Sequence, residues 1–153
     1  MAVSLDHSDT LAAQAESLLS GERDRIANAA NLSALLFQAL TKVNWVGFYF
    51  AHGEELIVGP FQGKPACVRI PFGRGVCGKA AASAKTIRVE DVHEFKDHIV
   101  CDLDSRSEIV VPLSKSGEVI GVLDIDSPVA RRFSAADERL LEEIAEIYVN
   151  SID

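Results

Sequence analysis

The sequence predicts an α+β fold, one domain in which helices at both ends of the chain pack on a mostly antiparallel sheet of about six strands. Three observations support this prediction. Apolar residues recur at helical spacing mainly towards the two ends, short runs rich in aromatic and β-branched residues fill the middle, and turn-forming residues join several of these runs as hairpins. With 153 residues, 48% of them hydrophobic, the chain suits a single core, so we expect one domain over 1–153 that starts with a helical segment over 1–20.

The first half of the chain is predicted to form two helices and then a strand hairpin. Leu11, Ala15 and Leu18 have the spacing of one helical face, and a similar apolar stripe follows Arg23. The next run is aromatic and β-branched, and residues 52–54 form a tight connection into another extended run. The expected elements are a helix over 8–19, a helix over 23–43, a strand over 45–50 and a strand over 55–58.

The second half is predicted to contain further strands, a short helix and a C-terminal helix. Residues 115–118 connect its two strongest strands, and Ser134 with Asp137 three residues later is a shortened capping box for the last helix. The expected elements are an extended run over 66–70, a helix over 79–83, a strand over 86–89, a polar loop with one helical turn over 90–104, strands over 107–112 and 119–126, and a helix over 134–151.

Residues 73–78 have the pattern G-x-G-x-x-G, which is typical of a dinucleotide-binding turn. Their surroundings argue against that function, because Pro71 interrupts the preceding strand and the helix that follows is short. The chain is also too short for a doubly wound sheet. We therefore interpret the stretch as a glycine-rich turn that opens a short helix carrying Cys77, and we predict no cofactor.

The acidic balance of the chain limits its partners. Asp and Glu outnumber Lys and Arg by 23 to 15, so we expect neither nucleic acid nor an anionic membrane surface as a partner. The N-terminus carries acids where a secretion signal carries bases, and no run approaches the ~18 consecutive apolar residues of a membrane span. Together with an odd number of cysteines, three, this favours a cytoplasmic protein.

The strand over 119–126 carries the most informative side chains. Because side chains alternate across a sheet, Asp124 and Asp126 share one face of it. Two neighbouring carboxylates are costly to bury without partners, so that face is either solvated or lines a site for a cationic group. Asp126 by itself also fits an ordinary strand end before Pro128.

Glu108 opens the strand that precedes this one. If the two strands pair as a hairpin, Glu108 lies near the end that holds Asp124 and Asp126, although the sequence leaves the register open. Like charges at close range raise at least one carboxyl pKa, which makes a protonated acid available at neutral pH. Glu108 is therefore a candidate general acid.

The three cysteines differ in their surroundings. Cys101 lies in a polar loop just before Glu108, where reactive thiols tend to sit, whereas the Gly- and Ala-rich setting of Cys77 suits a small buried side chain. The side chains from which a zinc site could be drawn are Cys67, Cys77, His93, His98 and Cys101. Their spacing lacks the C-x-x-C pairs of structural zinc sites, so we predict no metal site from them.

Four segments and the cysteine spacing give the chain a specific resemblance. The segments are NWVGFY (44–49), VGPFQG (58–63), GVCG (75–78) and GVLDIDS (121–127), and the cysteines follow in C-x9-C-x23-C order. From the second helix to the C-terminus this combination resembles the free methionine-(R)-sulfoxide reductases, a family built on the GAF fold. Sensory GAF domains share the fold but not the combination.

The resemblance implies that the chain reduces free methionine (R)-sulfoxide by thiol chemistry. The implied catalytic residues are Cys101 as attacking thiol, Cys67 as resolving thiol, Cys77 as a third cysteine able to enter disulfide exchange, and Glu108. The implied substrate-binding residues are Trp45, Tyr49, Glu108, Asp124 and Asp126. Thioredoxin would reopen the resulting disulfide, and a homodimer is one oligomeric state to consider.

Two other functions stay open on the sequence. A non-catalytic GAF sensor would bind a small ligand in the same pocket, and a redox-switch protein would use a disulfide to alter an interaction. A sensor is normally joined to an output domain, for which we expect no room in this chain. Release of methionine from free methionine sulfoxide would separate the enzyme from both alternatives.

Overall fold

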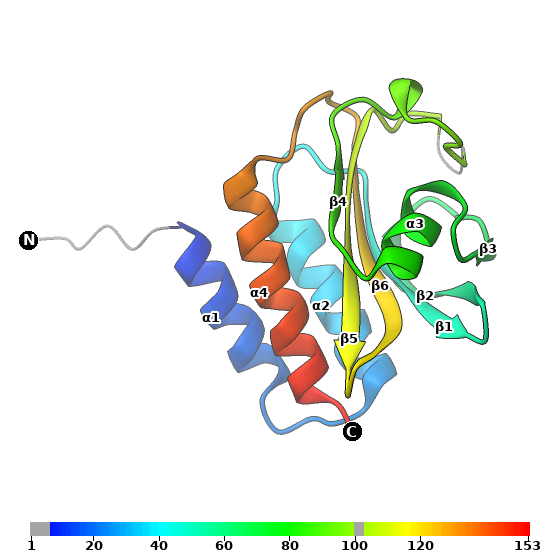
Figure 1. Cartoon of the computed structure of the whole chain (residues 1–153). Coiled ribbons are helices and arrows are strands. Elements are labelled where there is room, and N and C mark those ends of the chain that lie inside the picture. The colour runs from blue at the N-terminus through cyan, green and yellow to red at the C-terminus, as the bar shows by residue number, and fades with distance from the viewer. Residues whose placement is uncertain (1–6, 100–102) are drawn as a thin grey trace, which may run out of the picture.

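The computed structural model describes residues 7–99 and 103–153 of the chain. The strands are β1 (Trp45–His52), β2 (Glu55–Gly63), β3 (Arg69–Pro71), β4 (Ile87–Val89), β5 (Ser107–Lys115) and β6 (Glu118–Ser127). The helices are α1 (His7–Leu19), α2 (Arg25–Ala39), α3 (Gly75–Ser83), the 3-10 turn η1 (Val92–Glu94) and α4 (Ala135–Ser151). The strands form one antiparallel sheet in the order β3-β2-β1-β6-β5-β4, which confirms the predicted α+β fold (Figure 1).

Helices α1, α2 and α4 form a layer on one side of the sheet (Figure 1). α2 and α4 contact the strands directly, and α1 packs on both of these helices. Phe48 of β1 meets Tyr148 of α4 with ring centroids 4.7 Å apart, and Tyr148 Oη donates to the carbonyl of Arg25 at the start of α2. The larger of the two hydrophobic cores lies in this layer, so the opposite face of the sheet is the one left for a binding site.

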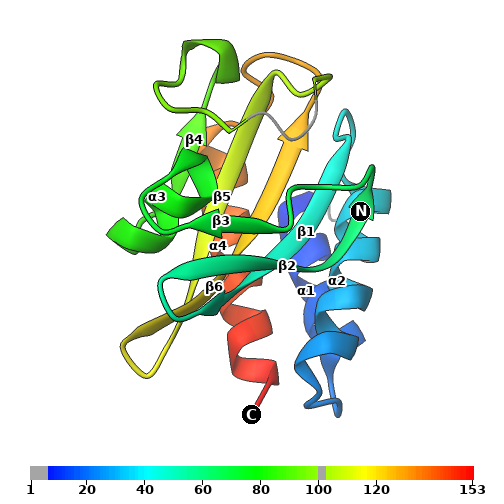
Figure 2. The same ribbon diagram turned by 90° about the vertical axis from the view of Figure 1, so that its right-hand side faces the viewer.

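The opposite face is covered by α3 and β3 (Figure 2). The alternation of β1 divides its side chains, because Phe48 points into the helical layer while Trp45 and Tyr49 belong to a second, smaller core with Cys77 of α3. The same alternation on β6 sends Asp124 to this side. The side chains predicted to carry function therefore lie on the α3 face.

The β5–β6 hairpin sets the register on which the site depends. Ser116 and Gly117 in its turn have φ values of 53° and 81°, the left-handed conformation that suits the twist of a tight hairpin. Pairing continues along both strands to Ser107 and Ser127. The hairpin prediction is therefore confirmed, with strands that extend beyond the predicted 107–112 and 119–126.

The second helix is shorter than the predicted 23–43. It begins after Asp24, whose carboxylate accepts hydrogen bonds from the N–H groups of Ile26 and Ala27 at 3.0 and 2.8 Å. It ends at Ala39, and the chain then turns through Lys42 with a φ of 58°. The apolar stripe does not reveal this stop, because neither a glycine nor a proline marks it.

β2 runs past its predicted end at residue 58, and the reason is a bulge. Tyr49 pairs with Val58 and Gly47 with Phe61, so Gly59 and Pro60 both lie opposite Phe48. A bulge leaves backbone groups out of the ladder, so a proline without an N–H is tolerated there. The prediction ended the strand at these two residues because they usually break strands.

The remaining predictions differ from the structure at the ends of elements. β3 is shorter than the predicted run 66–70 and shifted to Arg69–Pro71, whereas α3 begins at Gly75 rather than at residue 79. The last helix is capped as predicted, because Ser134 Oγ accepts from Asp137 N–H while the carboxylate of Asp137 accepts from Ser134 N–H. Among the described residues, no helix combines the length and hydropathy needed to cross a bilayer.

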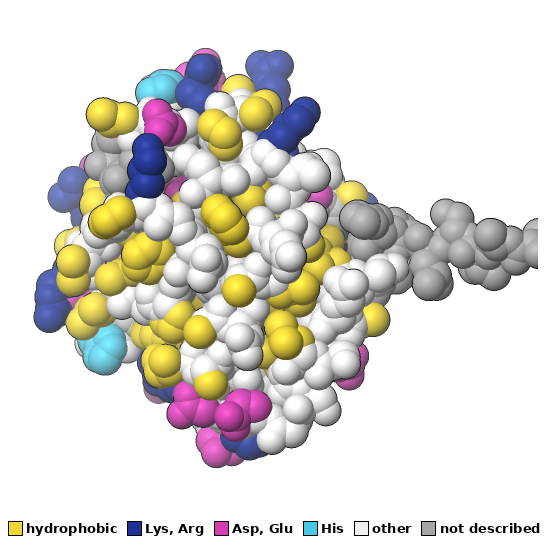
Figure 3. Space-filling view, turned by 180° about the vertical axis from the view of Figure 1, so that it is seen from behind, with side chains coloured by type: hydrophobic (Ala, Val, Ile, Leu, Met, Phe, Trp, Pro, Cys, Tyr) yellow, Lys and Arg dark blue, Asp and Glu magenta, His cyan; other side chains and the backbone are white. Residues whose placement is uncertain are grey.

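The reverse side of the molecule carries hydrophobic side chains dispersed among polar ones (Figure 3). A hollow between α1 and α2 is lined, among the described residues, by uncharged side chains: Gln14, Ser17, Leu18, Leu35, Gln38 and Ala39. Exposed apolar groups of this kind are usual on protein surfaces.

Candidate functional site

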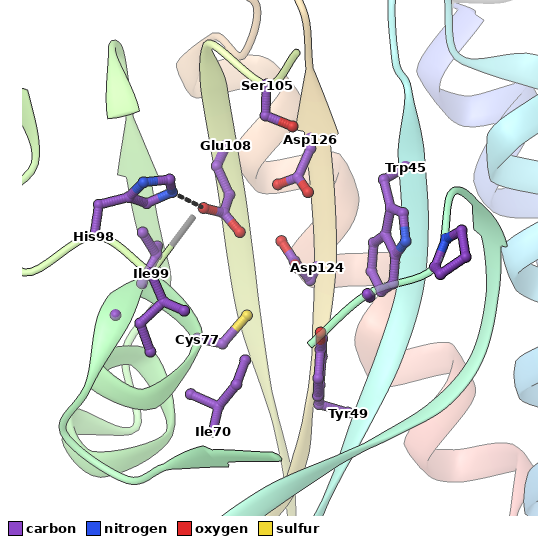
Figure 4. A pocket seen from close by; sticks show the side chains of 14 residues that line it. Trp45, Tyr49, Ile70, Cys77, His98, Ile99, Ser105, Glu108, Asp124 and Asp126 are labelled. Carbon is purple, nitrogen blue, oxygen red and sulfur yellow. Dashed lines mark ion pairs between the residues drawn. The ribbon is translucent and has the colours of Figure 1, made fainter. Parts of the chain in front are cut away.

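A pocket lies on the α3 face of the sheet, over β1, β6 and β5 (Figure 4). α3 and the segment between β2 and β3 form its other walls. About 550 Å³ of space between atoms lies in this pocket, open solvent at its mouth included. The lining residues are Trp45, Tyr49, Pro65, Ala66, Ile70, Gly75, Val76, Cys77, His98, Ile99, Ser105, Glu108, Asp124 and Asp126.

Three carboxyl groups meet at one end of this pocket. Glu108 of β5 lies opposite Asp126 of β6 in the strand register, and Asp124 is two residues further along the same face. Glu108 is 7% and Asp124 5% exposed, and Oδ1 of Asp124 has no hydrogen-bond partner among the described residues. The structure thus brings together the three acids that the sequence singled out, and it leaves one buried oxygen ready to accept a hydrogen bond.

The electrostatics of the cluster favour protonated acids when the pocket is empty. Burial raises the pKa of Glu108 well above its ordinary value, and the nearby Asp124 carboxylate raises it further. Burial likewise raises the pKa of Asp124, with the charge of Asp126 as the second cause. The cluster therefore keeps its protons to higher pH than exposed carboxyl groups do, and a cation entering the pocket would favour the ionised forms again.

We expect Glu108→Gln to make the folded protein more stable at pH 8 than the wild type. The folded-state pKa of Glu108 lies above its unfolded value, so its contribution to stability is fully present below about pH 4.5 and declines as the pH rises towards the folded-state pKa. Glutamine does not titrate and escapes this loss. Melting temperatures of both proteins from pH 4 to pH 8 should diverge with rising pH, and curves that stay parallel would contradict the assignment.

Cys77 adds a thiol to the same cluster. It lies in the first turn of α3, is buried, and points its sulfur towards Asp124 and Glu108 (Figure 4). Burial raises its pKa, and the charges of Asp124 and Glu108 raise it further, so the free thiol stays protonated. This setting is the opposite of the one that activates a nucleophilic cysteine.

Of the other two cysteines, the structure describes Cys67 alone. Cys67 is half-buried in the segment between β2 and β3 and is disulfide-bonded. Cys101, the predicted attacking thiol, lies outside the described residues.

Two aromatic residues hold the segment that contains Cys67. Trp45 Nε1 donates to the carbonyl of Lys64 at 3.1 Å, and Tyr49 Oη donates to the carbonyl of Cys67 at 3.0 Å. Their rings are stacked with centroids 5.9 Å apart. Trp45 and Tyr49 therefore form one wall of the pocket, where the resemblance places them, and also fix the backbone of the Cys67 segment.

His98 is a site residue that the sequence prediction missed, since it was considered only as a zinc ligand. Its Nε2 lies 3.9 Å from Oε1 of Glu108, and its side chain is 15% exposed. Burial lowers its pKa, with the charge of His93 as the second cause, so the imidazole is neutral at neutral pH. Its position three residues before Cys101 in the polar loop was the available signal.

The G-x-G-x-x-G stretch is explained by packing. A Cβ atom on Gly78 would collide with the carbonyl of Pro71, and Gly73 N–H donates to the Gly78 carbonyl at 2.7 Å. Gly75, with a φ of 62°, opens the helix. The glycines therefore let α3 lie directly against β3 and aim Cys77 into the pocket.

Comparison with known proteins gives consistent matches. The GAF domain family matches residues 24–152. Protein YtsP of Bacillus subtilis is 58% identical over 135 residues, which is 87% of this chain and 83% of that protein. The free methionine-R-sulfoxide reductase of Escherichia coli is 54% identical over 127 residues, 83% of this chain and 77% of that protein. The structure of the free methionine-R-sulfoxide reductase from Neisseria meningitidis in complex with its substrate is 44% identical with a TM-score of 0.91, covering 99% of this chain and 93% of that one.

Proposed function

The chain belongs to the GAF domain family and to the free methionine-R-sulfoxide reductases within it, and we propose that it reduces free methionine (R)-sulfoxide in the pocket between α3 and the sheet. One observation carries this proposal, the cluster of buried Glu108 and Asp124 with half-buried Asp126, in which one oxygen of Asp124 has no hydrogen-bond partner among the described residues. Such a cluster suits a small ligand that carries one positive charge and one group to be protonated.

The two aspartates are suited to recognise the ammonium group of a free amino acid. Charge-assisted hydrogen bonds from an ammonium to Asp124 and Asp126 would satisfy the open oxygen and offset the repulsion within the cluster. A methionine sulfoxide within a peptide has no α-ammonium group and would leave these acids without a cation. The cluster therefore supports selectivity for the free amino acid.

Asp124→Asn and Asp126→Asn are expected to weaken substrate binding with little change in the chemical step. A neutral amide cannot match a carboxylate as acceptor for an ammonium, and hydrogen bonds to charged groups are worth about 1.5–3 kcal/mol, or roughly 10- to 150-fold in KM. Steady-state kinetics would show this, with Asp153→Asn at the exposed C-terminus as the matched control. Unchanged KM values for both variants would place the ammonium elsewhere.

The reduction itself needs a thiolate and an acid. Glu108, protonated through its burial, would donate a proton to the sulfoxide oxygen, and Cys101 would attack the sulfur. The oxygen passes to Cys101 as a sulfenic acid while methionine is released, so the thiol is oxidised by the two electrons that reduce the sulfoxide. Trp45 and Tyr49 would hold the methyl end of the substrate.

Cys67 is proposed as the resolving thiol. It would attack the sulfenic acid of Cys101, form a disulfide and release water, and a thioredoxin-type dithiol would reopen that disulfide by exchange. The chain has three cysteines, of which Cys67 is disulfide-bonded and Cys77 is a free buried thiol. This pattern supports a pair formed by Cys67 and Cys101, with Cys77 in reserve as a third cysteine for exchange.

Cys67→Ser is expected to keep the first turnover and to slow all later ones. Rapid-quench experiments should then show a burst of about one equivalent of methionine, followed by slow release limited by recycling. The wild type with excess thioredoxin is the reference. If the variant gives no burst, Cys67 takes part in the chemical step and the proposed division of roles is wrong.

Methionine release separates this function from a GAF sensor. The protein is incubated with free L-methionine (R)-sulfoxide and either dithiothreitol or reduced thioredoxin, with the (S) diastereomer as the control. Catalytic release of methionine from the (R) form is expected. Binding of the sulfoxide without release would favour the sensor.

A further inference from the structure

Three side chains in the pocket are arranged so that one metal ion could reach all of them. Cys77 comes from α3, Glu108 from β5 and Asp124 from β6, and their ligand atoms, one per residue, all lie within 4.8 Å of one another. All three residues are buried, and their side chains converge (Figure 4). They are 31 and 16 positions apart in the chain, so no sequence motif for zinc includes them.

Among the described residues, no lysine or arginine lies in the pocket to balance the charge of Glu108 and Asp124. Oδ1 of Asp124, on a residue that is 5% exposed, has no hydrogen-bond partner in the part of the chain that the structure describes. Buried acids in such a setting favour any cation of suitable size and ligand preference.

The donor set determines which cation fits. One sulfur with carboxylate oxygens suits a borderline-soft ion such as Zn²⁺, whereas Mg²⁺ and Ca²⁺ take six or more oxygen ligands. At Zn–S of about 2.3 Å and Zn–O of about 2.0–2.2 Å, tetrahedral ligand atoms are roughly 3.5 Å apart. Because the ligand atoms lie within 4.8 Å of one another, each pair would have to close by at most about 1.3 Å, a shift within the reach of a small side-chain rotation.

We propose that Cys77, Glu108 and Asp124 form a site for Zn²⁺ that competes with the ammonium group of the substrate. Binding replaces the proton of the Cys77 thiol and any proton held by Glu108 or Asp124, so a thiolate–zinc bond and carboxylate–zinc bonds form and the displaced protons are released to solvent. Water completes the coordination. Binding of zinc is inferred from the geometry of the three side chains. Competition between zinc and the substrate, and therefore reversible inhibition of the enzyme by zinc, rests on the proposed function.

The test uses the protein in the oxidised state, so that Cys67 is held in its disulfide and Cys77 is the free thiol. Co²⁺ is the probe, because a cobalt–thiolate bond has a charge-transfer absorption that binding to surface carboxylates lacks. We expect one equivalent of Co²⁺ to give this absorption and one equivalent of Zn²⁺ to abolish it. Absence of the band at millimolar Co²⁺ would overturn the proposal.

Substitutions in the pocket test which side chains bind the metal ion. Cys77→Ala should lose the band, and Asp124→Asn should weaken Co²⁺ binding at least tenfold, while Glu142→Gln on the exposed side of α4 should leave it unchanged. Melting curves identify any variant that fails to fold. Cys77→Ala and Asp124→Asn each test one ligand, so the proposal can still be tested if one of them does not fold. A band that survives in folded Cys77→Ala, or undiminished binding in Asp124→Asn, would contradict the assigned ligands.

Competition is measured without turnover. Free methionine, which carries the same ammonium group as the substrate, should displace Co²⁺ from the oxidised protein at concentrations at which glycine, which chelates Co²⁺ in solution through the same amino and carboxylate groups, does not. Cobalt binding without displacement by methionine would refute the competition and leave the metal site standing. Catalytic activity in a protein that binds no Co²⁺ would refute the metal site and leave the reductase standing, so the two proposals fail separately.

Discussion

Replacing Cys101 by serine is expected to abolish turnover. A serine hydroxyl is a far weaker nucleophile than a thiolate and cannot accept the sulfoxide oxygen as a sulfenic acid, so the reaction has no other route in the proposed mechanism. The measurement is methionine release in a single turnover and in the steady state. Both should fall to the level of a sample without enzyme, while binding of free methionine sulfoxide persists.

Cys67→Ser and Cys77→Ala serve as controls for this result. Each removes one thiol, and the first turnover should survive in both because Cys101 is present. If Cys101→Ser retains steady-state activity while Cys67→Ser is inactive even in a single turnover, the roles of attacking and resolving thiol are reversed.

Glu108→Gln is expected to lower kcat by roughly 10²–10⁴-fold, the usual worth of general acid catalysis. Glutamine keeps the shape of the side chain but has no acidic proton to give to the sulfoxide oxygen. The stability of the variant should rise at pH 8, since an acid with a raised pKa is removed from a buried cluster. A more stable and much slower enzyme is the combined result that separates a catalytic acid from a structural one.

The control for Glu108→Gln is Glu142→Gln, which changes an exposed acid on α4. It should leave both kcat and the melting temperature close to the wild type. If Glu108→Gln unfolds the protein, or folds and keeps the wild-type kcat, then Glu108 is structural and the proton comes from another group.

The order of helices and strands and the face shared by Asp124 and Asp126 followed from the sequence. Both depend on local regularities, the helical repeat of apolar residues and the two-residue alternation of a strand. The position of Glu108 opposite Asp126 was left open because the register depends on how the hairpin turn closes, at Ser116 and Gly117.

Other features depended on tertiary packing and could not be predicted. Pro60 lies inside β2 because a bulge accommodates it, although proline usually ends a strand. The approach of His98 to Glu108 and of Cys77 to Asp124 joins residues from different elements. Cys77 was interpreted as a small buried side chain, and the structure shows that it is buried but faces the carboxylates rather than an apolar core alone.

The most direct test of the account compares two substrates with the wild-type enzyme. Free L-methionine (R)-sulfoxide and its N-acetyl derivative contain the same sulfoxide, but only the first has an ammonium group for Asp124 and Asp126. We predict that kcat/KM for the free amino acid exceeds that for the N-acetyl derivative by at least tenfold, and that Asp124→Asn narrows the difference. Equal values of kcat/KM for the two substrates would contradict recognition of a free amino acid by the acidic cluster.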